Sequence, residues 1–131
     1  MILLDTHALI WFIDNPEFLS TKARREINRA FSLQKIYFSQ ISYWEISMLV
    51  AKGRLVFNIQ LKEWLESVER LPQCTSVGIT PSIAAINYEL SDTFHGDPAD
   101  RIIVATAIDL NVPLITKDKV IENCKKIKTI W

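Results

Sequence analysis

Four carboxylate residues occur at positions from which a metal-dependent site for phosphoryl-transfer chemistry could form. They are Asp5, Glu45, Asp100 and Asp118, each at the end of an expected strand or at the start of an expected helix. Because the carboxyl ends of parallel strands lie at one edge of a sheet, we expect these acids to meet in a small volume. Two like charges about 5 Å apart repel by roughly 3 kcal/mol at an effective dielectric constant near 20, so such a cluster predicts a bound cation.

The ligand chemistry of these acids favours Mg²⁺ or Mn²⁺, because sites built only from oxygen ligands select hard divalent cations over zinc. Such a cation can bind a phosphate oxygen, lower the pKa of a bound water and stabilise the leaving oxygen. The hydroxyls of Thr6, Ser39 and Thr116 are candidates to support the site. Arg101 and Lys117 are candidates to contact phosphate.

Each acid taken alone also has a simpler interpretation as a helix cap. Ser42 and Glu45 have the spacing of a capping box, and Asp97 followed by Pro98 is typical of a helix start. The capping interpretation extends to Asp5, Asp100 and Asp118, and Arg101 could instead pair with a neighbouring acid. The arrival of acids from four separate segments at one edge is what favours the metal site.

The elements that position these acids alternate between strands and helices. Met1–Leu4 is wholly apolar, which is typical of a strand covered on both faces. Further strands are expected at Ile36–Phe38, Thr75–Ile79, Pro113–Thr116 and Ile127–Ile130. The alternation predicts an α/β fold, a three-layer sandwich with a central, mainly parallel β-sheet flanked by helices.

Helices are expected over His7–Ile13 with Thr6 as its cap, from Ser20 or Thr21 with Ala23, Ile27, Ala30 and Phe31 inward, and over Ser42–Lys52, Leu61–Leu71, Pro81–Leu90 and Pro98–Asn111. The first of these helices and the stretch Tyr43–Val50 are apolar on more than one side. Either both faces belong to the core, or one is a surface for a partner.

Composition limits the classes of function that the chain can serve. Its 131 residues predict one domain spanning 1–131, with 15 basic and 15 acidic residues and no net charge. A chain without basic excess must hold a phosphate-rich ligand by a local patch or a metal. No apolar run reaches the roughly 18 residues of a membrane span, and the two distant cysteines predict a reduced, cytoplasmic protein.

Five short stretches occur in an order and spacing that is more specific than any of them alone. They are Leu3–Trp11, Ser42–Ile46, Gly53–Leu55, His95–Arg101 and Leu114–Asp118. Together they resemble the PIN-domain nucleases, and within that family they are most similar to the toxin ribonucleases of bacterial VapBC-type toxin–antitoxin pairs.

The resemblance implies a PIN-like fold and an endoribonuclease that depends on Mg²⁺ or Mn²⁺ and cleaves RNA with a metal-activated water. By the same resemblance Asp5, Glu45, Asp100 and Asp118 are catalytic and metal-binding, and Asp97 is a further candidate ligand. It further implies an RNA substrate, a small cognate antitoxin protein and a homodimer.

Several alternatives remain at this point. The chain could be a PIN-like RNA-processing nuclease outside a toxin–antitoxin pair, or a non-catalytic PIN-like module that binds a partner. A phosphate-accepting receiver domain is disfavoured because no Asp ends a middle strand. A haloacid-dehalogenase-like phosphatase is disfavoured because His7 stands where its second Asp is required.

Overall fold

A five-stranded sheet with strand order β3-β2-β1-β4-β5 organises the molecule, and every neighbouring pair in it is parallel. In the computed structural model, which describes residues 1–131, the strands are β1 (Ile2–Leu4), β2 (Ile36–Ser39), β3 (Cys74–Val77), β4 (Leu114–Ile115) and β5 (Thr129–Ile130). The predicted α/β fold with a parallel sheet is therefore confirmed. The third strand begins one residue earlier than predicted, and the last is confined to its final two residues.

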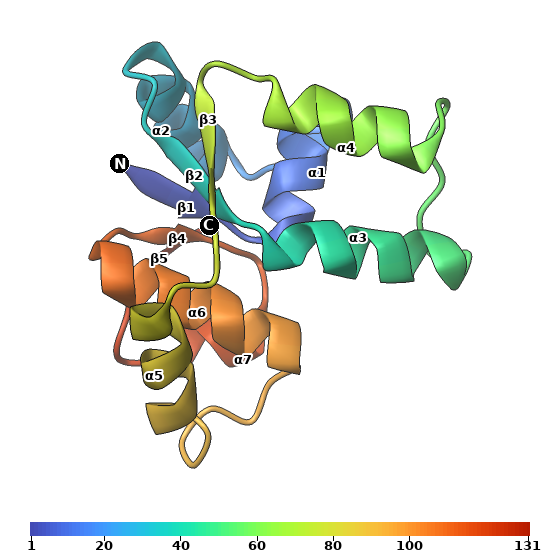
Figure 1. Cartoon of the computed structure of the whole chain (residues 1–131). Coiled ribbons are helices and arrows are strands. Elements are labelled where there is room, and N and C mark those ends of the chain that lie inside the picture. Colours follow the sequence, from blue (N-terminus) through green and yellow to red (C-terminus); the bar gives the residue numbers. More distant parts are fainter.

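Helices cover both faces of this sheet (Figure 1). They are α1 (Thr6–Asp14), α2 (Thr21–Ser32), α3 (Ile41–Ala51), α4 (Leu61–Glu69), α5 (Pro81–Glu89), α6 (Pro98–Leu110) and α7 (Lys119–Glu122), with a 3₁₀ turn at Pro16–Phe18. In Figure 1, α1, α2 and α4 lie on one side of the sheet and α5, α6 and α7 on the other. None of the helices is long and apolar enough to cross a membrane.

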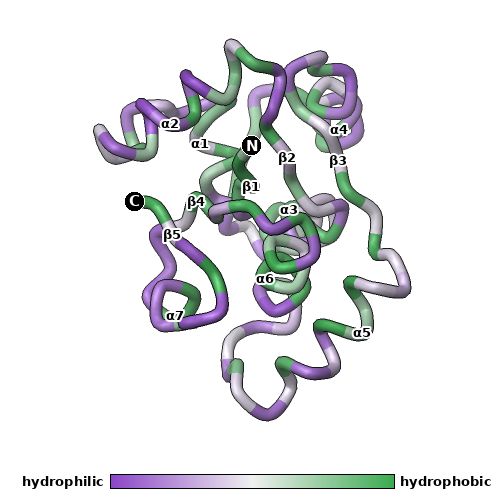
Figure 2. Tube along the Cα trace, turned by 90° about the vertical axis from the view of Figure 1, so that its left-hand side faces the viewer, coloured by the Kyte–Doolittle hydropathy of each residue, from purple (hydrophilic) through white to green (hydrophobic).

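The central strand β1 explains why the chain begins with an unbroken apolar run. Successive side chains of a strand point to opposite faces, so Ile2 and Leu4 enter the core beneath α1 and α2, while Leu3 enters the core beneath α6. Leu3 lies opposite Tyr37 of β2 and Leu114 of β4 and is completely buried. Figure 2 shows the consequence, with hydrophobic segments along the central strands and hydrophilic ones on the outer turns.

Three local predictions were wrong in detail. Asp5 rather than Thr6 caps α1, because its backbone is extended and its Oδ1 accepts the Ala8 N–H at 2.6 Å. The helix α3 begins at Ile41 with Gln40 before it, so Ser42 lies inside the helix and the capping box does not form. Phe31 is 40% exposed, because it lies at the edge of α2 against the ring of Phe12 instead of in the core.

The two helices that are apolar on more than one side, α1 and α3, differ in how much of their apolar surface is buried. In α1 the residues Ala8, Leu9 and Ile10 are buried, and the three that follow pack against the same core. In α3 only Ser42 and Ile46 are buried, and Trp44 is 52% exposed. The first helix is thus mainly a core element, whereas α3 leaves apolar surface uncovered.

Because the Ile27 side chain of α2 is buried in the core, we expect Ile27→Val to lower the free energy of unfolding by about 0.5–1.5 kcal/mol. Ile27 is 1% exposed, whereas Ile79, which is 51% exposed, offers the same substitution as a control. Denaturant unfolding of both variants measures the difference. Equal loss in Ile27→Val and Ile79→Val would contradict the assigned packing of α2.

Candidate active site

Asp5 is the most enclosed acid of the molecule's sheet edge. It follows β1 directly and is 6% exposed, and its Oδ1 accepts the Ala8 N–H. Burial raises its pKa from an ordinary 3.8 to about 6, although the Thr116 hydroxyl, the Ala8 N–H and the charge of His7 each act to lower it. The charge of Glu45 raises it further, which shows that these two acids lie close enough to repel.

Asp100 is the residue around which the other acids gather. It stands in the first turn of α6, two residues after Pro98, and is partly buried. Burial raises its pKa from 3.8 to about 7, and the charges of Glu45, Asp118, Asp97 and Asp5 raise it in that order. The structure therefore brings all five acids that the sequence singled out into one electrostatic neighbourhood.

Glu45 contributes a carboxylate that the fold leaves unsatisfied. It lies in the second turn of α3, and its Oε1 is buried without a hydrogen-bond partner. A buried oxygen without a partner costs the desolvation energy of that group, more so when it is charged. A buried carboxylate oxygen without a partner, placed next to other acids, is chemically suited to binding a cation.

Asp97 and Asp118 each combine helix capping with a place near Asp100. The Oδ1 of Asp97 accepts the Ala99 N–H at 3.2 Å at the start of α6. The Oδ1 of Asp118 accepts two backbone N–H groups, from Val120 at 2.7 Å and Ile121 at 3.1 Å. In each case the recorded cap bonds use Oδ1, so the capping interpretation and the site interpretation are compatible.

The predicted hydroxyls divide into two roles. Thr116 accepts the Asp118 N–H at 3.1 Å and bonds to Asp5, so it connects two of the acids. Ser39 is buried but accepts the Ile41 N–H at 3.3 Å, which makes it a support for the start of α3.

Thr6 also acts between elements, through a partner that the sequence did not single out for the site. Its Oγ1 lies 2.9 Å from the Oγ of Ser42, and both side chains are buried. Thr6 follows Asp5 at the start of α1, and Ser42 lies one turn before Glu45 in α3. The pair therefore links α1, which begins after Asp5, to α3, which contains Glu45. Ser42 carried only a capping-box signal in the sequence, and the contact across 36 positions requires the fold.

The two predicted phosphate contacts are both free of carboxylate partners. Arg101 donates from Nε to the Oδ1 of Asn87 at 3.0 Å, so α5 orients its side chain. The alternative pairing of Arg101 with a neighbouring acid does not form. Lys117 is exposed, and its Nζ lies 5.9 Å from the centre of the Trp11 ring. Asn87 had no signal in the sequence.

The residues present fit a hard divalent cation, although they are not yet closed around one. No group of three His, Cys, Asp or Glu side chains is close enough to hold a metal as it stands. The donor set is nevertheless oxygen only, it contains the unpartnered Glu45 Oε1, and its members raise one another's pKa. The charge of a bound cation would offset the repulsion among these carboxylates.

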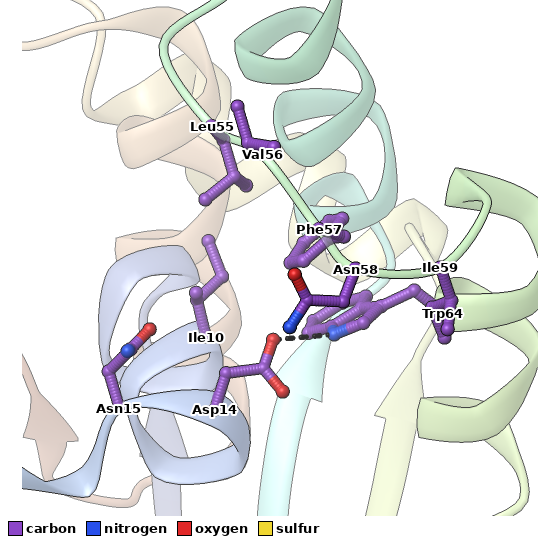
Figure 3. A pocket seen from close by; sticks show the side chains of 9 residues that line it. All are labelled: Ile10, Asp14, Asn15, Leu55, Val56, Phe57, Asn58, Ile59 and Trp64. Carbon is purple, nitrogen blue, oxygen red and sulfur yellow. Dashed lines mark hydrogen bonds between the residues drawn. The ribbon is translucent and has the colours of Figure 1, made fainter.

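A separate pocket lies away from these acids (Figure 3). It has a volume of about 310 Å³ and is lined by the end of α1, residues 55–59 and Trp64 of α4. There the Asp14 Oδ2 accepts the Trp64 Nε1–H at 2.8 Å, and Phe57 stacks on Trp64. None of the five gathered acids lines this pocket, so it is not the site of their chemistry.

Comparison with known proteins adds a family profile, a curated relative and several solved structures. The profile described as the PIN domain matches residues 2–127. Ribonuclease VapC22 from Mycobacterium tuberculosis is 35% identical over 132 residues, spanning 99% of this chain and 98% of the relative.

The solved structures share the fold at low sequence identity. One match is a chain in the structure of VapBC2 from Rickettsia felis bound to a DNA fragment from the VapBC2 promoter. Its TM-score is 0.70, at 17% identity over 98% of this chain and 97% of that chain. A chain of FitAcB from Neisseria gonorrhoeae gives 0.65 and 24% over 98% and 96%, and a toxin–antitoxin complex from Klebsiella pneumoniae gives 0.63 and 21% over 97% and 95%.

The raised pKa values predict how the stability of the metal-free protein depends on pH. Because the folded pKa values of about 6 for Asp5 and about 7 for Asp100 exceed the ordinary 3.8, the folded state binds more protons than the unfolded state between these limits. The stability that these two groups contribute is therefore present below about pH 4 and is lost as the pH rises to about 7.

Asp100→Asn removes one of these titrations, so in EDTA we expect it to match the wild type near pH 4 and to be the more stable protein at pH 8. Urea unfolding across this range measures the difference. Asp92→Asn, in the exposed loop after α5, is the matched control and should show no such divergence. A constant offset between Asp100→Asn and wild type at every pH would contradict the assigned protonation.

Proposed function

Because this chain belongs to the PIN-domain family, we propose that it is a metal-dependent endoribonuclease acting as the toxin of a toxin–antitoxin pair. The single observation that carries the proposal is the gathering of four acids around Asp100, with the Glu45 Oε1 left unpartnered. The identity to a ribonuclease over nearly the whole length of both chains supports RNA as the substrate.

In the proposed site Asp5, Glu45, Asp100 and Asp118 hold Mg²⁺ or Mn²⁺, with Asp97 at its edge. When bound, the cation would activate a water for attack on phosphorus and stabilise the leaving oxygen of the cleaved RNA strand. The donors are all carboxylate oxygens, which suits these cations.

The remaining residues position the acids and the substrate. Thr116 holds Asp5 and Asp118 in register, and the Thr6–Ser42 pair fixes the start of α1 against α3. The Lys117 ammonium and the guanidinium of Arg101 are available to non-bridging phosphate oxygens, because neither is paired with a carboxylate. Glu45 is carried by α3, and its Oε1, which has no hydrogen-bond partner, is free to bind the cation.

We further propose that the chain acts in the cytoplasm as a homodimer whose activity a small antitoxin protein blocks. The incompletely covered helix α3, with Trp44 52% exposed, supports a protein interface next to Glu45. The structural neighbours were solved as toxin–antitoxin assemblies, which supports an antitoxin as one such partner.

Substitution of Asp5 tests the metal-dependent chemistry while leaving the fold in place. Asn is also a good N-cap, so Asp5→Asn should keep α1 while removing one charged ligand. We expect RNA cleavage in Mg²⁺ to fall to the background level and EDTA to abolish the wild-type activity. Full activity in Asp5→Asn, or activity that EDTA does not change, would reject the proposed site.

Substitution of Glu45 tests cation binding separately from cleavage. At about 100 times its dissociation constant Mg²⁺ should stabilise the wild type by about 2.7 kcal/mol, seen as a rise in Tm. Glu45→Gln should lose most of this rise, whereas Glu63→Gln on the exposed surface of α4 should keep it. An equal rise in all three proteins would show that the cation binds elsewhere.

Expression in a bacterial host tests the role as a toxin. We expect the chain alone to arrest growth, and co-expression of the neighbouring open reading frame to relieve the arrest. The Asp5→Asn variant should not arrest growth, which links the effect to cleavage. Growth arrest by Asp5→Asn equal to that of the wild type would instead favour a non-catalytic, partner-binding function.

A further inference from the structure

A group of aromatic rings with one lysine lies beside the proposed site. Trp11 is at its centre, with ring centroids of His7 and Trp131 each 5.6 Å away and that of Phe18 at 6.1 Å. The Lys117 Nζ lies 5.9 Å from the Trp11 ring. We call these five residues, from α1, the 3₁₀ turn, the segment after β4 and the C-terminal residue, the Trp11 patch.

The Trp11 patch is continuous with the acids. His7 lies two residues after Asp5 and is close enough for its charge to act on that carboxyl. Lys117 lies between Thr116, which bonds to Asp5, and Asp118. Two of the five residues in the patch therefore lie within two chain positions of an acid of the site, on the side formed by β1 and β4.

The Trp11 patch also contains side chains that are exposed, and its lysine forms no ion pair within the protein. His7, Lys117 and Phe18 are exposed, with Phe18 at 57%, while Trp11 and Trp131 are half-buried. The ion pairs of the molecule join other residues, so the Lys117 charge is available to a ligand. An exposed ring of His7 and an unpaired ammonium thus stand next to the position where a phosphate would be cleaved.

Rings and a lysine in this combination match two of the three components of a nucleotide, the base and the phosphate. Unstacked bases stack on aromatic side chains with little dependence on sequence, and phosphates bind lysine. The chain has no net charge, so attraction by the molecule as a whole cannot hold RNA, and local contacts must do so.

We propose that the Trp11 patch is a binding subsite for single-stranded RNA, in which a base flanking the scissile phosphate stacks on His7 against Trp11 and Lys117 contacts the adjoining phosphate. The inference rests on the proposed function and names residues that hold its substrate. His7 and Trp11 are positioned by one turn of α1, whose start Asp5 caps, so the base would be held at a fixed offset from the acids.

The test measures RNA binding apart from cleavage. A fluorescein-labelled single-stranded RNA of mixed sequence is titrated with the full chain carrying Asp5→Asn, and anisotropy gives the dissociation constant over a series of salt concentrations. His7→Ala should weaken binding by about 5- to 100-fold, since one base loses its stacking partner. Lys117→Gln should weaken binding and reduce the slope of log affinity against log salt by about 0.7, the value of one phosphate contact on a single strand.

Matched variants separate stacking and charge from other effects. His7→Phe keeps a ring without the imidazole and should retain the parent affinity. Tyr88→Ala removes a 78% exposed ring on α5, and Lys22→Gln removes an exposed lysine on α2, so both should bind as the parent does. With Asp5 restored and Mg²⁺ present, His7→Ala should raise KM more than it lowers kcat, and thermal unfolding should verify that each variant is folded.

Two results would overturn the subsite, and they are distinguishable. If the wild type cleaves RNA but His7→Ala and Lys117→Gln bind as tightly as the two controls, the patch does not hold RNA and the proposed function stands. The same holds if His7→Phe loses as much affinity as His7→Ala, since stacking is then not the contact. If the wild type neither binds nor cleaves RNA in Mg²⁺, the proposed function fails and the subsite fails with it.

Discussion

Repulsion among the carboxylates around Asp100 is the constraint on which the rest of the structure depends. Four of the five acids stand at the ends of strands or at the starts of helices, and Glu45 lies in the second turn of α3. Two of the five have pKa values raised to about 6 and about 7. A chain selected only for stability would replace several of these residues with neutral ones, because each buried charge lowers the free energy of unfolding. Their joint presence is reasonable where a positive ligand belongs among them.

The fold withstands this repulsion because the acids are attached to its most rigid parts. Asp5 and Asp118 follow the adjacent strands β1 and β4 closely, and Thr116 joins the two acids. Three of the acids also cap helices, so their main chains are fixed by bonds to backbone N–H groups. The same carboxylates that destabilise the site electrostatically therefore help to start α1, α6 and α7, which limits the net cost of keeping them.

Much of this arrangement could be predicted from the sequence, because it depends on local signals. The unbroken apolar run before Asp5 indicated a central strand, and the pair Asp97-Pro98 indicated the start of α6 and with it the place of Asp100. The rule that parallel strands end at one edge was enough to bring the acids together. The residue at which each helix begins was harder to predict. Asp5 and Thr6 are both residue types that cap helices, and only the backbone conformation decides between them.

Contacts between distant segments could not be predicted, because they depend on how helices pack. Ser42 meets Thr6 and Asn87 meets Arg101 through polar atoms that carry no periodic signal. The Trp11 patch joins α1 to the chain's last residue, a proximity created only when β5 adds to the sheet beside β4. The sequence likewise did not predict whether the second apolar face of α3 is buried or exposed. An apolar helix has the same sequence pattern in both cases.

The buried Thr6–Ser42 pair gives α3 the geometry of a lever. Of the five acids, only Glu45 lies in the body of a helix, and it lies about 4.5 Å along the axis from Ser42 at a rise of about 1.5 Å per residue. Ala51, at the far end of α3, lies about 13.5 Å from Ser42 along the axis. A tilt of α3 about Ser42 would therefore move Ala51 roughly three times as far as Glu45. Glu45 therefore lies on the part of α3 that the Thr6–Ser42 pair restrains most, and a displacement of the distal turn would reach Glu45 reduced about threefold.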